Sequence, residues 1–123
     1  KIIKLDIPRI NQYTIHNLNT IGVNHVKFEI APKSTEVQLN WEDAVAYCDS
    51  LNIDGESGWR LPMIDELNEI YQSNNDFNKD WYWSSTEGLD GYAWNQVFSN
   101  GSEDNFTKSG LNFVRAIRDL KDN

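Results

Sequence analysis

Two amphipathic helical segments follow one another between residues 41 and 73, with β-like sequence on both sides of them. Their apolar residues recur at the three-to-four-residue spacing of a single helix face. These residues are Trp41, Ala44, Val45, Cys48 and Leu51 in the first segment and Ile64, Leu67, Ile70 and Tyr71 in the second. A strand, two consecutive helices and then several strands are the order of an α+β domain, which is the predicted fold class.

The ends of both helices are marked by capping residues. Asn40 is a good N-cap for a helix over 41–51, and Asp43 falls where a carboxylate meets free backbone N–H groups. Pro62 precedes the second helix, and Asp65 and Glu66 lie in its first turn, where the helix dipole favours them. This helix is predicted to end near Ser73, at the start of a polar run.

The remaining sequence predicts strands and turns. Residues 1–7 alternate weakly before Pro8 and predict an edge strand, and residues 26–30 alternate clearly. Residues 81–84 and 92–99 read as strands, and Asn100-Gly101 predicts a hairpin turn that needs positive φ. Residues 102–110 are a polar loop or a return strand, and residues 113–118 a closing strand. We therefore expect two helices packed on a twisted, mostly antiparallel sheet.

Composition limits the classes of partner. The 123 residues suffice for one domain, and five Trp, five Tyr and five Phe are a heavy aromatic load that fills a core or stands on a contact surface. The net charge of −8 argues against binding to nucleic acid and to anionic membranes. No apolar run approaches the ~20 residues of a membrane-spanning helix, so no membrane insertion is expected.

A single cysteine, Cys48, lies on the inward face of the first helix. It cannot form an internal disulfide, it gives no indication of an oxidising compartment, and a buried thiol is its simplest interpretation. The chain begins with Lys1 and not with Met, so we expect a segment upstream of it; no signal peptide is visible from Lys1 onward.

Four segments in order resemble one family. They are LNWEDAVAYCDSL, GWRLPMIDEL, YWSSTE and the pair AWNQVFSNG and FVRAIR, over roughly residues 26–119. Together they resemble the Lcl carboxy-terminal domain family, a bacterial and phage family. The resemblance implies a C-type-lectin-like fold. The first two segments also resemble formylglycine-generating enzymes, which share this fold. Residues 26–123 would form this domain, and residues 1–25 an amino-terminal strand or arm.

This chain departs from the family pattern at two positions. The family commonly has a second Cys where this chain has Ala116, bridged to the helix cysteine, so Cys48 and Ala116 are expected to be neighbours within disulfide reach. Met63 stands where the family usually has a Thr as helix N-cap, a loss on the order of 1 kcal/mol that Asp65 and Glu66 would partly offset.

Catalysis is not expected. Formylglycine-type oxidation needs a cysteine pair, and His16 and His25, the only histidines, are interpreted as surface residues. Most acids stand at helix starts or in loops, where capping and solvation explain them. Trp94-Asn95-Gln96 lacks the Asp of sugar-binding, Ca²⁺-dependent lectins, so no cofactor is predicted. Ca²⁺ binding stays an open alternative, because oxygen ligands could come from the loop acids Glu87, Asp90, Glu103 and Asp104.

The candidate binding residues belong to a loop-rich face over about residues 84–112, whose Tyr, Ser, Asn and Gly content is typical of antibody paratopes. They are Trp81, Tyr82, Glu87, Asp90, Tyr92, Asn95, Asn100, Asp104 and Asn105. Trp41, Trp59, Trp83 and Trp94 are expected in the core instead. Arg60 and Arg115 lie on strand-like segments, and at least one should be partly buried and paired with a helix acid such as Glu66 or Asp65.

The leading functional hypothesis is a non-catalytic recognition or adhesion module, extracellular on a cell surface or on a virion, that binds a glycan or a surface protein. A second hypothesis is a structural assembly or decoration subunit of a phage virion or tail. In that case residues 1–10 would add a strand to a neighbouring chain or to a homo-oligomer partner. The third hypothesis is that the protein is an enzyme.

Overall fold

The structure, a computed structural model, describes residues 3–8, 25–73 and 76–120, and for residues 3–8 and 25–27 it describes the backbone alone. His16 lies outside these residues, as does the side chain of His25. The elements in chain order are β1 (Ile3–Pro8), β2 (His25–Ile30), the short 3₁₀ helix η1 (Lys33–Thr35), β3 (Val37–Leu39), α2 (Trp41–Ser50), β4 (Trp59–Arg60), α3 (Ile64–Ser73), β5 (Trp81–Glu87), β6 (Tyr92–Val97), β7 (Glu103–Thr107), β8 (Asn112–Val114) and β9 (Ile117–Asp119). The predicted α+β class is confirmed.

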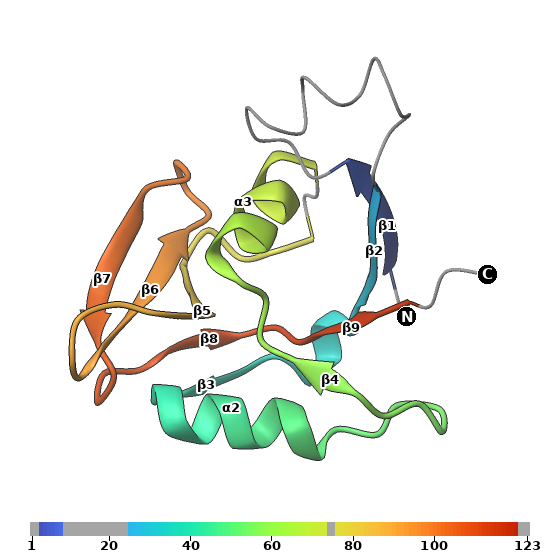
Figure 1. Ribbon diagram of the computed structural model, residues 1–123, viewed down its shortest axis with the longest axis horizontal. Coiled ribbons are helices and arrows are strands. Elements are labelled where there is room, and N and C mark those ends of the chain that lie inside the picture. Colours follow the sequence, from blue (N-terminus) through green and yellow to red (C-terminus); the bar gives the residue numbers. More distant parts are fainter. Residues whose placement is uncertain (1–2, 9–24, 74–75, 121–123) are drawn as a thin grey trace.

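The strands are divided between two sheets. One has the order β1-β2-β9-β4 and the other β3-β8-β5-β6-β7, and every pairing is antiparallel except the one between β5 and β8. Figure 1 shows α2 and α3 on opposite sides of the path that β8 and β9 trace through the middle of the molecule. β1 is an edge strand, as its weak alternation and Pro8 predict.

Residues 113–118 were predicted as one closing strand, and the structure divides them. β8 lies in the five-stranded sheet and β9 in the four-stranded sheet, and the chain crosses between them at Arg115 and Ala116. The carbonyl of Ala116 accepts a hydrogen bond of 2.9 Å from the backbone N–H of Ala31, just beyond β2. The sequence FVRAIR repeats two apolar residues and an arginine across this junction, so the sequence pattern does not mark it.

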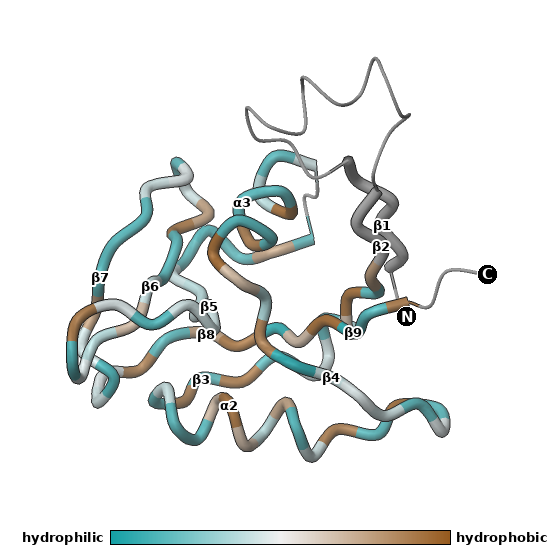
Figure 2. Tube along the Cα trace, in the orientation of Figure 1, coloured by the Kyte–Doolittle hydropathy of each residue, from teal (hydrophilic) through white to brown (hydrophobic). Residues whose placement is uncertain are grey.

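Both predicted helices are confirmed. Asn40 caps α2, since its side chain accepts a hydrogen bond of 2.9 Å from the backbone N–H of Asp43. Figure 2 shows hydrophobic and hydrophilic residues alternating along α2, as in an amphipathic helix with one buried side. Its buried residues are Trp41, Ala44 and Cys48.

The buried apolar residues form two clusters. One lies under α2, where Trp41, Ala44 and Cys48 meet, among others, Trp83 and Ala116. The other contains Leu67 and Ile70 of α3 together with Phe28, Ile30, Phe77, Tyr82, Phe98 and Ile117. Trp41, Trp59 and Trp83 are buried, as predicted, and Trp94 is half-buried. Cys48 and Ala116 share a cluster, and their disulfide-compatible separation stays a prediction.

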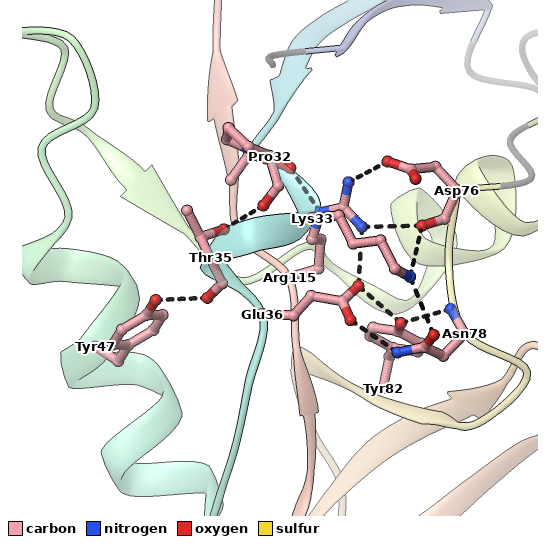
Figure 3. Close-up of polar contacts among 10 residues, drawn as sticks. Pro32, Lys33, Thr35, Glu36, Tyr47, Asp76, Asn78, Tyr82 and Arg115 are labelled. Carbon is pink, nitrogen blue, oxygen red and sulfur yellow. Dashed lines mark hydrogen bonds and ion pairs between the residues drawn. The ribbon is translucent and has the colours of Figure 1, made fainter.

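A buried arginine ties the sheet junction to its surroundings. Arg115 donates to the carbonyl of Ala31 at 2.6 Å, to the Glu36 carboxylate at 2.8 Å and to the Asp76 carboxylate at 2.6 Å. Figure 3 shows these groups, from the segment before β3 and from the loop after α3, converging on the guanidinium. The side chain of Arg115 is fully buried and that of Glu36 nearly so, and each is compensated by the other. The cluster is therefore structural.

Candidate functional site

A pocket of about 330 Å³ opens on the five-stranded sheet, near the lower end of the size range of small-molecule sites. We call it the amide pocket, and it is lined by Gln38, Asp80, Trp81, Asn95, Asp104, Phe106, Leu111, Asn112 and Phe113. These residues come from β3, β5, β6, β7 and β8 and from the segments just before β5 and β8. The pocket is thus built by strand pairing and not by one loop.

Strand register explains why these side chains meet. Asn95 of β6 pairs with Trp83 of β5 and with Asp104 of β7, and directly paired residues project from the same face of a sheet. Residues two positions along a strand share that face, which adds Trp81 and Phe106. One face of the sheet therefore carries an indole, a phenyl ring, an amide and a carboxylate side by side.

The parallel pairing of β8 with β5 adds a second amide to this face. Tyr82 pairs with Phe113, so the neighbouring residue, Asn112, projects from the opposite face, as Trp81 does. Trp83 and Ala93 on the Asn112 face pack in the cluster beneath α2. Trp81, Asn95, Asp104, Phe106 and Asn112 of the amide pocket occupy neighbouring positions of this face, beside the area taken by the cluster. Gln38 and Phe113 pair with each other and project from the Tyr82 face.

Asn95 and Asn112 form an incompletely bonded pair in the pocket. The two residues are only 2 % and 6 % exposed, and Asn95 Nδ2 lies 3.5 Å from Asn112 Oδ1, at the outer limit for a hydrogen bond. Asn95 Oδ1 and Asn112 Nδ2 are both buried, and among the described residues neither has a hydrogen-bond partner. A buried polar atom without a hydrogen bond lowers the stability of the fold by about 1–3 kcal/mol. As a purely structural feature, the pair would therefore destabilise the domain.

Apolar and acidic groups surround the amide pair. Leu111 is 63 % exposed at the pocket, while Trp81, Phe106 and Phe113 are half-buried. The exposed Asp80 and Asp104 each accept a hydrogen bond from the backbone N–H of the following residue, at 2.8 and 2.9 Å. The pocket therefore offers flat apolar surface, neutral hydrogen-bonding groups and a negatively charged border.

The structure brings three of the nine predicted binding residues together in the amide pocket: Trp81, Asn95 and Asp104. Tyr82 was also predicted at the binding face, but its side chain is fully buried on the other side of the sheet. Its hydroxyl donates to Glu36 at 2.8 Å and accepts from the backbone N–H of Asn78 at 2.9 Å. Burial, aided by the bond to Glu36, raises the pKa of Tyr82. Tyr82 is thus a core residue, which corrects this part of the prediction.

The other predicted residues lie outside the pocket. Glu87, Asp90 and Tyr92 gather at the β5–β6 hairpin, and Glu87 is paired with Lys108 at 3.1 Å. Because Tyr92 lies three residues from Asn95 along β6, the two are separated by roughly 10 Å. The predicted face thus divides into two groups at different positions along the same strands.

Asn100 and Asn105 have local structural roles. The Asn100 side chain accepts a hydrogen bond of 2.9 Å from Ser102, inside the predicted hairpin turn, where Gly101 has φ +85°. Asn105 lies against Gly88, where an added Cβ would come within 2.1 Å of its side-chain oxygen. Asn105 thereby packs the β5–β6 loop onto β7.

Sequence reasoning missed six residues of the pocket: Gln38, Asp80, Phe106, Leu111, Asn112 and Phe113. Asn112 could have been found, because it is a polar residue directly before the apolar pair Phe113-Val114. Such a residue faces inward only if it has a partner or a function. Asp80 and Gln38 carry no comparable signal, since both are ordinary exposed polar residues.

Two further ionisable side chains, those of Arg60 and Cys48, are held within the fold. Arg60 makes a bidentate pair with Glu66 at 2.8 Å for both contacts, as predicted, and it also contacts Asp119. The bonds to Glu66 and then to Asp119 raise the pKa of Arg60 above its usual range. Burial raises the pKa of the Cys48 thiol to about 12. Among residues 28–73 and 76–120, whose side chains the structure describes, there is no group of three or more His, Cys, Asp or Glu that could hold a metal ion.

A second hollow, of about 310 Å³, lies between α2 and the segment around Arg60. Val45, Ala46 and Leu61 give it an apolar lining. Arg60, the cation at its border, is already paired with Glu66 and Asp119. This hollow therefore lacks the unbonded polar atoms that distinguish the amide pocket.

Within the described helices, none is long and apolar enough to cross a membrane. Comparison with curated proteins finds no match. The family model described as the Lcl C-terminal domain matches residues 16–118, which is most of the chain and includes every residue of the amide pocket. The chain belongs to the Lcl C-terminal domain family.

Proposed function

We propose that this domain is a non-catalytic recognition module, displayed on a cell surface or virion, that binds a glycan in the amide pocket. The observation that carries the proposal is the Asn95–Asn112 pair, which leaves one acceptor and one donor unbonded at a pocket lined by aromatic side chains. Sugars present closely spaced hydroxyl or amide groups on a partly apolar ring. Flat aromatic surface next to amides suits that pattern.

The side chains of the pocket also favour binding over catalysis. General acid–base catalysis needs a group that can exchange a proton near neutral pH, and carboxamides cannot do so. The two acids, Asp80 and Asp104, are exposed, and each already accepts a backbone hydrogen bond. The lining residues include no Ser, Cys, Lys or His. We therefore assign the pocket to recognition.

Two exposed leucines provide a matched test. Leu111 lines the pocket, whereas Leu89, which is 77 % exposed, lies in the β5–β6 loop and outside the pocket. The wild type, Leu111→Ala and Leu89→Ala would be applied to an array of immobilised bacterial and animal glycans. We expect Leu111→Ala to weaken binding about fivefold or more, because it removes apolar contact with the ligand, and Leu89→Ala to leave binding unchanged.

A further variant separates the pocket from the β5–β6 hairpin. Asp90→Ala/Tyr92→Ala removes two exposed side chains near the β5–β6 hairpin without touching the pocket. If this variant loses binding while Leu111→Ala retains it, the binding site is the hairpin and not the amide pocket. If the folded wild type binds no glycan on the array, glycan recognition is wrong. Thermal unfolding of each variant would check that the fold is retained.

A structural assembly role is the second candidate, and the position of β1 favours it. Among the described strands β1 pairs only with β2, so one side of its backbone is open to another strand. The molar mass of the wild type and of a variant lacking residues 1–10 would be measured by light scattering. A stable oligomer that dissociates on deletion supports assembly through β1, and a monomer at high concentration argues against it.

A further inference from the structure

We infer that the amide pocket binds the acetamido group of a neutral N-acetylated sugar, an inference that rests on the proposed function and specifies its ligand. It starts from the Asn95–Asn112 pair. One contact between these amides, at 3.5 Å, uses one N–H and one oxygen. This contact leaves one oxygen and one NH₂ group without any hydrogen-bond partner, Asn95 Oδ1 and Asn112 Nδ2.

The arrangement of these two atoms limits what can bind them. They do not bond to each other, so any group that bridges them must donate to Asn95 Oδ1 and accept from Asn112 Nδ2. A trans secondary amide does this, because its N–H and C=O point in opposite directions. Both atoms are buried, and the broad terminal torsion of an Asn side chain lets either amide turn its free atom toward an entering group.

The apolar lining decides between an acetamido group and a hydroxyl, which could also donate and accept. Leu111 is largely exposed beside the half-buried Trp81, so apolar surface at the pocket is covered when a ligand binds. A hydroxyl brings no apolar surface with it. The methyl of an acetamido group adds apolar area next to the hydrogen-bonding pair and covers these side chains. The volume of about 330 Å³ leaves room for the sugar ring as well.

The charge around the pocket excludes acidic sugars. Asp80 and Asp104 lie at its border, no Lys or Arg is among its lining residues, and the chain carries a net charge of −8. A uronic acid or a sulfated sugar would be repelled, since neither an ion pair nor a bidentate arginine contact is offered. The ligand is therefore a neutral sugar.

The test uses three methyl β-glycosides of one stereochemistry: those of N-acetylglucosamine, glucose and glucosamine. They have the same ring and differ at one position, which carries an acetamido group, a hydroxyl or an ammonium group. Binding to the ¹⁵N-labelled protein would be followed by NMR, in which the Asn95 and Asn112 side-chain NH₂ groups and the Trp81 indole N–H report on the pocket directly. We expect N-acetylglucosaminide to shift these signals and to bind about tenfold more tightly than the glucoside.

The Asn112→Asp variant tests the hydrogen bond itself. The carboxylate can still accept from Asn95 Nδ2, so the existing contact is kept, but the free donor becomes an acceptor. We expect about a tenfold loss of affinity for the N-acetylglucosaminide. Because a buried carboxylate can impair folding, Asn112→Ser serves as a neutral second variant with the same expected direction, and far-UV circular dichroism checks the fold of both.

The outcomes separate this inference from the proposed function. If glucoside and N-acetylglucosaminide shift the pocket signals with equal affinity, the pocket recognises hydroxyls. The acetamido assignment then fails while glycan recognition stands. Tighter binding of the glucosamine derivative would mean that the border acids decide recognition, which also overturns the assignment. If none of these sugars, nor any glycan of the array, perturbs the pocket, the proposed function itself is wrong.

Discussion

At the scale of single residues, Arg115 shows how a buried charge can stabilise the fold without belonging to an active site. Its guanidinium is fully buried and its donors reach two carboxylates and two backbone carbonyls. Such a cluster resembles an active site in composition. Here every charge already has a partner within the fold, and Figure 3 shows these partners enclosing the guanidinium.

Removing this arginine should therefore destabilise the whole domain. Arg115→Met leaves the Glu36 carboxylate buried without its cation, and we expect the free energy of unfolding in urea to fall by about 3–5 kcal/mol. The double variant Arg115→Met/Glu36→Gln removes the uncompensated charge as well and should recover part of that loss. If the two substitutions destabilise additively, the pairing has no energetic importance.

The buried thiol of Cys48 predicts a pH dependence of stability. Its pKa rises from 9.0 in the absence of burial to about 12 in the folded state, so the folded protein retains a proton that the unfolded chain loses. This contribution is complete below about pH 9 and is lost as the pH rises from about 9 toward 12. Urea unfolding between pH 7 and 10.5 would be compared for the wild type and Cys48→Ala. The stability of the wild type should fall more steeply above pH 9, and parallel curves would contradict the prediction.

At the scale of elements, the start of α3 shows how a missing cap is replaced. Met63 provides no side-chain oxygen, but its backbone N–H donates to Glu66 Oε1 at 2.8 Å, which is one half of a capping box. The next N–H, that of Ile64, donates to the Thr86 hydroxyl of β5 at 2.9 Å. Thr86, which is distant in sequence, therefore helps Asp65 and Glu66 to stabilise the start of α3.

Two substitutions at this helix start should act in opposite directions. Met63→Thr restores a capping hydroxyl and should raise the free energy of unfolding by about 0.5–1 kcal/mol. Thr86→Val keeps the shape but leaves the Ile64 N–H without its acceptor, so it should lower stability by about 1–2 kcal/mol. Urea denaturation measures both. If Thr86→Val is neutral, the contact across the sheet contributes nothing to the helix.

The elements also show what the sequence could and could not predict. Both helices were predicted correctly, since their periodicity and capping signals are local. The β6–β7 hairpin was identified from Asn100-Gly101, where the turn chemistry is again local. The division into two sheets was not predicted, because the repeated apolar-apolar-arginine pattern of residues 113–118 does not mark the junction at Arg115. The amide pocket was found only in part, since Asn95 and Asn112 become neighbours through pairings between distant strands.

At the scale of the whole molecule, residues 112–119 hold the two sheets together. β8 lies between β3 and β5 in one sheet, and β9 lies between β2 and β4 in the other. A chain ending at residue 111 would lack both inner strands and open both cores, so we expect it to be unfolded throughout. A chain ending at residue 120 should stay folded. Hydrogen exchange would compare the two, and native-like protection of α2 or α3 in the shorter chain would contradict this prediction.

The position of β8 and β9 also bears on when the protein can fold. During synthesis β5, β6 and β7 can pair as soon as they are made, because they are consecutive hairpins. Neither sheet can be completed until residues 112–119 have left the ribosome, so the early strands must wait with open edges. Asn112 and Phe113 are also the last residues of the amide pocket to be translated. A ligand of this pocket would therefore distinguish finished molecules from interrupted ones.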